Sequence, residues 1–523
     1  MRRVVALLVV AALSFTGCSG DHDDKDTSSP TVPAGEWNPT RGMPFAEPDQ
    51  VGQGRDVAVT LDVKHRTIDV SGAPLGALPF TATPRDGQPL APKLNGPTLH
   101  VSPGGTINVT FVNNSGQDTN IHYHGMHVSP LGDSDNVFRT FAPNTTSRST
   151  VQVPANHPAG TYWYHVHFHG DSELQVNGGL SGLLIVDGVE NVLPPALQKV
   201  TQRQFALREA MTLGGAVVNK DNANDKNVKT TRLVNALLEP QLSMNQSEYQ
   251  LWRLANIGSD LFYHLRLQDH RFLLVAEDGN PVFNGRVRSF EELELPPGKR
   301  YDVLVLGGRP GSYKLTTRDL SGPMGDNNPE YTLATINVAA SPAAPSMRPE
   351  EITVRAGDDG LRRSRAGQRV SAERTFVFAF DGNSSDINGQ TFSPDRTDVA
   401  VELGAVEDWT LLNVTTNPHP FHIHVNEFQV LSINDVPYDA PGVQDVVTIP
   451  PMVDFVPGKV VIRNHYRDFT GWFVFHCHIL AHEDAGMMAT IQVLGPGERK
   501  APPPSSGGAP MPTGRPHSRI KVG

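Results

Sequence analysis

The sequence has almost no cysteine, since Cys18 and Cys477 are the only two among 523 residues. Cys18 lies near the N-terminus, so the body of the chain holds one cysteine, and one cysteine cannot form an internal disulfide. An excess of basic residues is also missing, because the formal net charge is −11. This charge excludes the basic footprint of a nucleic-acid-binding protein. Because Cys477 cannot form an internal disulfide, its possible roles are metal ligation, nucleophilic chemistry or inert packing.

The N-terminal apolar run, residues 4–13, is too short to cross a bilayer and follows two arginines, as in an export signal. Thr16 and Gly17 precede Cys18, and small residues before a cysteine resemble a bacterial lipoprotein signal. Cys18 would then be lipidated and hold the protein at a membrane surface, whereas an ordinary signal peptide would release it. We expect a lipoprotein-type signal peptide over 1–18, a tether over 19–49, and a protein exported to the outer face of the cell membrane or secreted.

Short alternating apolar runs, such as residues 106–112 and 301–306, recur along the chain and indicate strands rather than long helices. The 48 glycines and 43 prolines place turns between these runs. Composition and spacing predict an all-β protein of three tandem sandwiches. The expected units are residues 50–190, 198–345 and 350–495, followed by a disordered tail over 496–523.

Histidine is distributed unevenly, because ten of the 20 histidines lie in four short clusters and none of these clusters lies in the middle third. Every cluster contains His-x-His, and on a strand the two imidazoles of this motif project to the same side. Eight such imidazoles can hold several metal ions, although imidazole alone leaves copper, zinc, iron and nickel open. The clusters are His122 and His124; His165 and His167; His419, His422 and His424; and His476, His478 and His482.

Cys477 stands between His476 and His478, so on a strand it faces the opposite side from both of them. Two histidines, one cysteine and a weak axial methionine form the ligand set of a blue-copper electron-transfer site. A structural zinc site would need a fourth strong ligand, and a thiol hydrolase would not explain the other histidines. The pattern predicts one thiolate-bound copper with a polynuclear histidine site behind it.

The four motifs resemble those of the multicopper oxidases, the family of laccases, bilirubin oxidases and cuprous oxidases. The family patterns H-x-H-G, H-x-H, H-x-x-H-x-H and H-C-H-x-x-x-H-x-x-x-x-M correspond to residues 122–125, 165–167, 419–424 and 476–487. The resemblance covers roughly residues 50–495. It implies three cupredoxin-like Greek-key β-sandwich domains, with copper ligands in the first and third and a second domain that spaces them.

The resemblance also implies four copper ions in each chain. It assigns the type 1 copper to His419, Cys477, His482 and axial Met487; the type 2 copper to His122 and His422; and the type 3 pair to His124, His165 and His478 and to His167, His424 and His476. In the family, a donor gives single electrons to the type 1 copper, and O2 is reduced to water at the trinuclear cluster. We expect a monomeric oxidase of phenols, aromatic amines or metal ions, with a copper-binding or electron-carrier protein as the alternative.

Two acidic residues resemble the family's proton-delivery groups. Glu483 follows His482, and Asp135 lies downstream of the first motif, where Asp133 is a rival. Either acid could instead be an ordinary surface or capping carboxylate. His127 and His169 follow the first two motifs and are expected to be hydrogen-bond partners of ligands or surface residues. The 11 methionines form no methionine-rich insert, which disfavours a cuprous oxidase.

Overall fold

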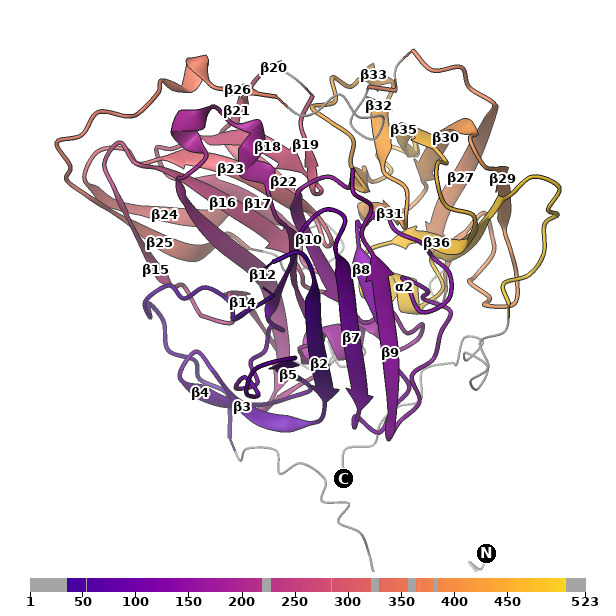
Figure 1. Ribbon diagram of the computed structural model, residues 1–523, viewed down its shortest axis with the longest axis horizontal. Helices are drawn as coiled ribbons and strands as arrows, with labels where there is room; N and C mark the ends of the chain where they lie inside the picture. The colour runs from indigo at the N-terminus through magenta and orange to yellow at the C-terminus, as the bar shows by residue number, and fades with distance from the viewer. Residues whose placement is uncertain are drawn as a thin grey trace, which may run out of the picture.

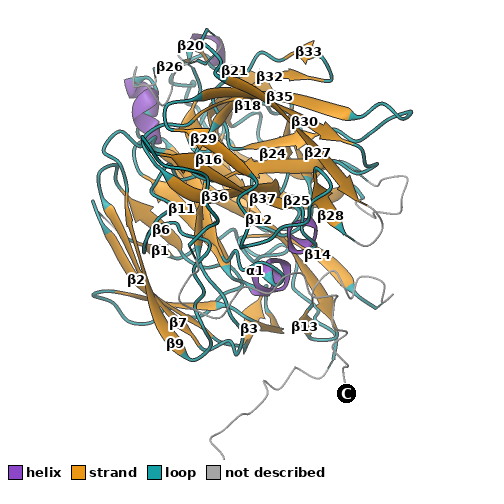
Figure 2. Cartoon of the chain, turned by 90° about the vertical axis from the view of Figure 1, so that its right-hand side faces the viewer, coloured by secondary structure: helices purple, strands orange, loops and turns teal. Residues whose placement is uncertain are grey.

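The computed structural model describes residues 35–504, except 53, 219–226, 284, 321–328, 356–363, 366 and 381–383. Cys18, the expected signal peptide and most of the expected tether lie outside these residues. Strands dominate the described chain, and the few helices are short (Figures 1 and 2). The all-β fold class is therefore confirmed. No described helix is long and apolar enough to cross a membrane.

The first sandwich packs a five-stranded sheet against a four-stranded one. Strand β7 alternates buried and half-buried residues along its whole length, as the alternating run predicts. The core between the sheets includes Leu61, Phe111 and Leu184. In sheet order the strands are β1 (Gln50–Val51), β6 (Thr98–Val101), β11 (Ser181–Val186), β10 (Gly160–His165) and β8 (His122–His124); and β5 (Phe80–Pro84), β2 (Val57–Val63), β7 (Thr106–Asn113) and β9 (Thr145–Gln152).

The second sandwich has a ten-stranded and a five-stranded sheet. Two strands from the first segment, β4 and β3, extend its larger sheet through a pairing between Gly76 and Ala216. The larger sheet runs β19 (Asn280–Pro281), β18 (Phe272–Glu277), β23 (Arg300–Leu306), β16 (Tyr249–Asn256), β12 (Thr201–Leu213), β13 (Ala216–Val217), β4 (Ala73–Ala77) and β3 (Arg66–Val70), with β14 (Lys229–Val234) on β12 and β21 (Arg288–Phe290) on β18. The smaller sheet is β15 (Gln241–Asn245), β25 (Tyr331–Ala339), β24 (Gly311–Thr317), β17 (Tyr263–Leu267) and β22 (Glu292–Leu295).

The third sandwich, orange to yellow in Figure 1, has a six-stranded and a five-stranded sheet. Cys477 and Met487 belong to its apolar core, beside Phe421 and Phe475. The sheets run β28 (Ser385–Ile387), β27 (Ala372–Phe380), β30 (Val406–Asn413), β35 (Gly458–His465), β32 (Phe428–Ile433) and β33 (Val436–Pro437); and β29 (Val399–Glu402), β37 (Met488–Leu494), β36 (Gly471–Cys477), β31 (His419–Ile423) and β34 (Val446–Ile449).

The remaining described elements are short. Helix α1 (Ser172–Gly178) follows the second histidine motif, α2 (Leu480–Asp484) follows the fourth, and the two helices contact each other. Asp484 joins them by accepting the backbone N–H groups of Ser172 and Glu173 at 3.1 and 2.9 Å. The rest are a small ladder of β20 (Gly285–Arg286) with β26 (Thr353–Val354) and the 3₁₀ turns Val189–Val192, Pro195–Leu197 and Pro349–Glu351.

The start of the expected disordered tail lies on the third sandwich. The Ala501 N–H donates to Gln492 Oε1 at 2.8 Å, and the Ala501 carbonyl accepts from Trp472 Nε1 at 3.1 Å. Because these hydrogen bonds hold it in place, the segment up to residue 504 is ordered rather than disordered. Residues 505–523 lie outside the described residues.

Candidate metal centre

Eight buried histidines from the first and third sandwiches converge at one place, and we call them the histidine cluster. Strands β8 and β10 align His122 with His165, and strands β31 and β36 align His422 with His476. His167, His424 and His478 lie just beyond the ends of their strands. Three groups of three have ligand atoms within 4.8 Å of one another: His122, His124 and His422; His124, His165 and His478; and His167, His424 and His476.

Hydrogen bonds orient these rings. The Nδ1 atoms of His165, His422 and His476 lie 2.8–3.0 Å from backbone carbonyl oxygens. Because a carbonyl only accepts, each Nδ1 carries the proton and each Nε2 keeps its lone pair for a metal. The Nε2 atoms of His165 and His422 are buried and have no hydrogen-bond partner among the described residues. Burial also lowers the pKa of His165 and His476 well below the ordinary value, so the rings are neutral, as ligation requires.

The thiolate site comprises His419, Cys477, His482 and Met487. Cys477 Sγ lies 3.4 Å from His419 Nδ1 and 3.6 Å from His482 Nδ1. Backbone hydrogen bonds connect Met487 to two other residues of this site. Its carbonyl accepts the Cys477 N–H at 3.1 Å, and its N–H donates to the His482 carbonyl at 2.9 Å. The neighbouring His476 points instead toward His167 and His424, as strand alternation predicts.

Asp135, rather than its rival Asp133, lies beside the histidine cluster. Its Oδ1 is 2.9 Å from His122 Nδ1 and accepts the Tyr123 N–H at 2.9 Å. Burial raises the pKa of Asp135 to about 8. Asp133 is exposed and forms an ion pair with Arg139. A carboxyl at this position can hold the His122 ring and carry a proton at neutral pH.

Glu483 is fully buried between the first and third sandwiches. Its Oε1 accepts the Ser172 hydroxyl at 3.0 Å and lies 3.4 Å from His167 Nδ1, while Oε2 lies 3.2 Å from His476 Nδ1. Burial first, and then the neighbouring Asp484 carboxyl, raise the pKa of Glu483 well above its usual value. The group is neither a surface nor a capping carboxylate, because it contacts two rings of the histidine cluster.

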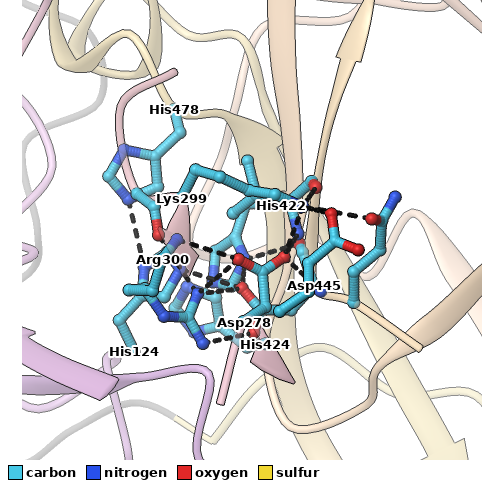
Figure 3. Close-up of polar contacts among 12 residues, drawn as sticks. His124, Asp278, Lys299, Arg300, His422, His424, Asp445 and His478 are labelled. Atoms are coloured by element: carbon cyan, nitrogen blue, oxygen red, sulfur yellow. Dashed lines mark hydrogen bonds and ion pairs between the residues drawn. The ribbon is translucent and has the colours of Figure 1, made fainter. Parts of the chain in front are cut away.

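Sequence reasoning missed a polar network that reaches the histidine cluster from the second sandwich (Figure 3). The Arg300 guanidinium donates twice to the Asp445 carboxylate, at 2.7 Å each, and Asp445 Oδ1 lies 3.0 Å from His124 Nε2. Burial favours the neutral acid, but Arg300 outweighs it and lowers the pKa of Asp445 to about 2. The only available signal is the run 296–303, whose Pro-Pro-Gly start indicates no more than a turn before a strand.

His127 and His169 are both buried rather than exposed, and neither joins the metal-binding groups found among the described residues. His127 Nδ1 lies 2.7 Å from the Val425 carbonyl, and its Nε2 lies 2.9 Å from Asp468 Oδ2. The His169 ring contacts Phe392 edge-on at 4.7 Å between centroids. Both therefore contact the third sandwich across the interface between domains.

A buried histidine cluster beside a cysteine–histidine site, carried on β-sandwiches, defines a copper-dependent oxidoreductase. Sequence profiles described as "Multicopper oxidase" match residues 82–191, 196–341 and 368–496. The chain belongs to the multicopper oxidase family. Copper is therefore its implied cofactor, and the inward-facing imidazoles and the buried thiol are donors that suit copper.

Known relatives agree with this assignment. The multicopper oxidase mco of Staphylococcus haemolyticus is 27% identical over 408 residues, which cover 76% of this chain and 82% of the relative. A multicopper oxidase structure from Campylobacter jejuni, described as a metallo-oxidase, superposes with a TM-score of 0.72 at 21% identity and covers 88% of this chain and 98% of that one. A laccase-like oxidase from Ochrobactrum has a TM-score of 0.69 at 25% identity, covering 86% of this chain and all of that one.

Proposed function

We propose that this chain is a four-copper oxidase that takes single electrons from small donors and reduces O2 to water. The observation that carries the proposal is the pair of adjacent sites: Cys477 belongs to the thiolate site, and His476 and His478 on either side of it belong to two of the three groups of imidazoles. A pure electron carrier needs only the thiolate site. The eight further buried histidines therefore favour an oxidase over the carrier alternative.

The proposed ligands follow the groups of donor atoms. His419, Cys477 and His482 would hold the type 1 copper, with Met487 as the axial ligand; His122 and His422 the type 2 copper; and His124, His165, His478 and His167, His424, His476 the type 3 pair. When bound, copper supplies the one-electron redox chemistry and the reaction with O2.

The protein's own residues would connect the two sites and supply protons. Cys477 is bonded through the backbone to His476 and His478, so the thiolate site and the histidine cluster are joined by a short covalent path. Glu483 contacts His167 and His476, and burial raises its pKa well above the usual value, which suits this carboxyl to carry a proton. Asp135 would act in the same way beside His122.

We propose aromatic donors such as phenols and amines, with metal ions as the other class. The oxidase activity of the Ochrobactrum relative towards lignin model compounds and lignosulfonate supports the aromatic class. The test is to load the protein with copper and to record the visible spectrum and O2 uptake with phenol, amine, Fe(II) and Cu(I) donors. We expect an intense blue band and O2 uptake that is fastest with phenols. Absence of the band, or blue colour without O2 consumption, would contradict the proposal.

We also propose that Cys18 is lipidated, that this anchors a monomeric exported protein at the outer face of the membrane, and that secretion is the alternative. The support is the sequence alone, namely the short apolar run and the small residues before Cys18. Cells expressing the protein are grown with a radioactive fatty acid, and label should appear in the wild-type chain but not in Cys18→Ala. Equal labelling of the two chains would refute lipidation.

A further inference from the structure

The second domain, which contributes none of the proposed copper ligands, closes directly over the histidine cluster. Gly298 lies so near two rings that a Cβ there would be 2.9 Å from His124 Cε1 and 3.0 Å from His478 Cδ2. Two residues later, the Arg300 side chain is fully buried. A domain that merely spaced the other two would not need to pack its backbone against the rings.

Arg300 hydrogen-bonds to all three domains. Its Nε donates to the Thr161 carbonyl in the first domain at 3.2 Å, and Nη1 donates to the Gly298 carbonyl in the second at 3.1 Å. Both Nη atoms hold Asp445 in the third. Gly125, next to His124, leaves the room for this group, because a Cβ there would lie 2.1 Å from Arg300 Nη2.

The backbone around Asp445 is fixed from the second domain as well. Asp278 Oδ2 accepts the N–H groups of Asp445 and Val446 at 3.0 Å each, and Lys299 Nζ donates to the Val446 carbonyl at 2.9 Å. The Asp445 carboxylate therefore has a fixed position and a fixed charge. A buried ion pair contributes little net stability compared with apolar packing. The main consequence of the Arg300–Asp445 pair is therefore that the carboxylate is held in one position.

His124 is the ring on which this network acts. Its Nε2 faces Asp445 Oδ1 at 3.0 Å, and its Nδ1 faces His478 Nε2 at 3.2 Å. A carboxylate clamped by a guanidinium accepts hydrogen bonds and donates none, so the His124 proton sits on Nε2 and the lone pair on Nδ1. This is the reverse of His165, His422 and His476, whose Nδ1 atoms face carbonyls.

We propose that Arg300 is a positioning residue of the second domain that, through Asp445, fixes the tautomer and orientation of His124 so that Nδ1 is presented as a copper ligand. The inference rests on the proposed function, because it concerns the same copper cluster. It assigns the second domain a part in assembling that cluster, in place of the spacer role that the sequence suggested.

The test compares the copper held at the two sites in Arg300→Gln, Arg300→Lys and a matched control, Arg253→Gln. Arg253 is also a buried second-domain arginine; it pairs with Asp302 at 3.4 Å and donates to Gln202. Each chain is loaded with copper, challenged with a chelator, and assayed for bound copper per chain and for the blue band of the thiolate site. Turnover with a phenol donor gives kcat and KM.

For Arg300→Gln we expect the blue band and the donor KM to stay unchanged, while copper retention at the histidine cluster and kcat fall by about 10- to 100-fold. Arg300→Lys keeps the charge but cannot make the paired contact, so its loss should be intermediate. Arg253→Gln should retain its copper. If Arg300→Gln does not fold, Arg300→Lys and the isosteric Asp445→Asn must show the selective loss.

Folded Arg300 variants with wild-type resistance to the chelator would overturn the positioning role alone. Equal loss of copper from both sites would also overturn it, because the effect would then be general destabilisation. A wild-type chain that binds no copper at the eight histidines would overturn both this role and the proposed function.

Discussion

Gly298→Ala gives the sharpest perturbation of the histidine cluster, because it adds one methyl group without changing charge. Gly298 has φ +85°, and its added Cβ would lie 2.9 and 3.0 Å from ring carbons of His124 and His478. Comfortable carbon–carbon contact is about 3.5–4.0 Å, so the rings or the backbone must shift by roughly 0.5–1 Å. The left-handed backbone adds a cost of about 1–2 kcal/mol for any residue with a Cβ.

A shift of about 1 Å in a reacting geometry can lower the rate about 100-fold. We therefore expect Gly298→Ala to lower kcat for O2 uptake by up to about that factor, while the blue band persists because the thiolate site lies on the other face of β36. The control is Gly404→Ala, since Gly404 has φ +86° but nothing within 4 Å of its added Cβ. It should lose stability and keep its turnover.

The assay is O2 uptake in an electrode chamber, with thermal unfolding of both variants measured in parallel. Wild-type turnover in a folded Gly298→Ala chain would refute the close approach of the second domain to the cluster. Equal loss of turnover in Gly404→Ala would show that backbone strain, rather than contact with the rings, causes the effect.

Three further predictions concern single side chains. Glu483→Gln should slow O2 reduction several-fold and keep the blue colour, because it removes a proton carrier but no ligand. Stopped-flow reoxidation measures this rate. Wild-type turnover of the variant across pH would contradict a role of Glu483 in proton delivery. In the copper-free chain, burial raises the pKa of Asp135 from 3.8 to about 8, so the folded state holds a proton that the unfolded state releases. Stability should then decline by up to about 1.4 kcal/mol per unit as pH rises through this window, and Asp135→Asn should flatten the decline in denaturant titrations; an unchanged slope would contradict the raised pKa. Cys477→Ser should abolish the blue band and the turnover of donors but retain copper at the histidine cluster. The copper content should then be about one ion lower per chain than in the wild type. Loss of all copper would contradict independent copper binding at the two sites.

The sequence was sufficient for the parts of the site that depend on local periodicity. Alternation along a strand predicts that His476 and His478 share a face and that Cys477 takes the other, and the contacts of Cys477 with His419 and His482 agree. The all-β class follows from the same alternation, as in β7. These predictions succeed because the two-residue period of a strand is a property of neighbouring residues.

The features of the fold and the site that the sequence did not predict depend on contacts between distant segments. Arg300 and Asp445 are 145 residues apart, and neither belongs to a histidine motif. Nothing local indicates that Gly298 lies against two rings, or that β3 and β4 join the sheet of the second sandwich. Burial raises the pKa of both Asp135 and Glu483, and sequence spacing does not report burial.

We propose that this chain couples one-electron oxidation of a donor to complete reduction of O2. The most direct measurement is the ratio of donor oxidised to O2 consumed by the copper-loaded protein, with peroxide assayed in the same reaction. We expect four one-electron donors to be oxidised for each O2, with no peroxide released. A ratio of two with peroxide as the product, or donor oxidation without O2 uptake, would contradict it.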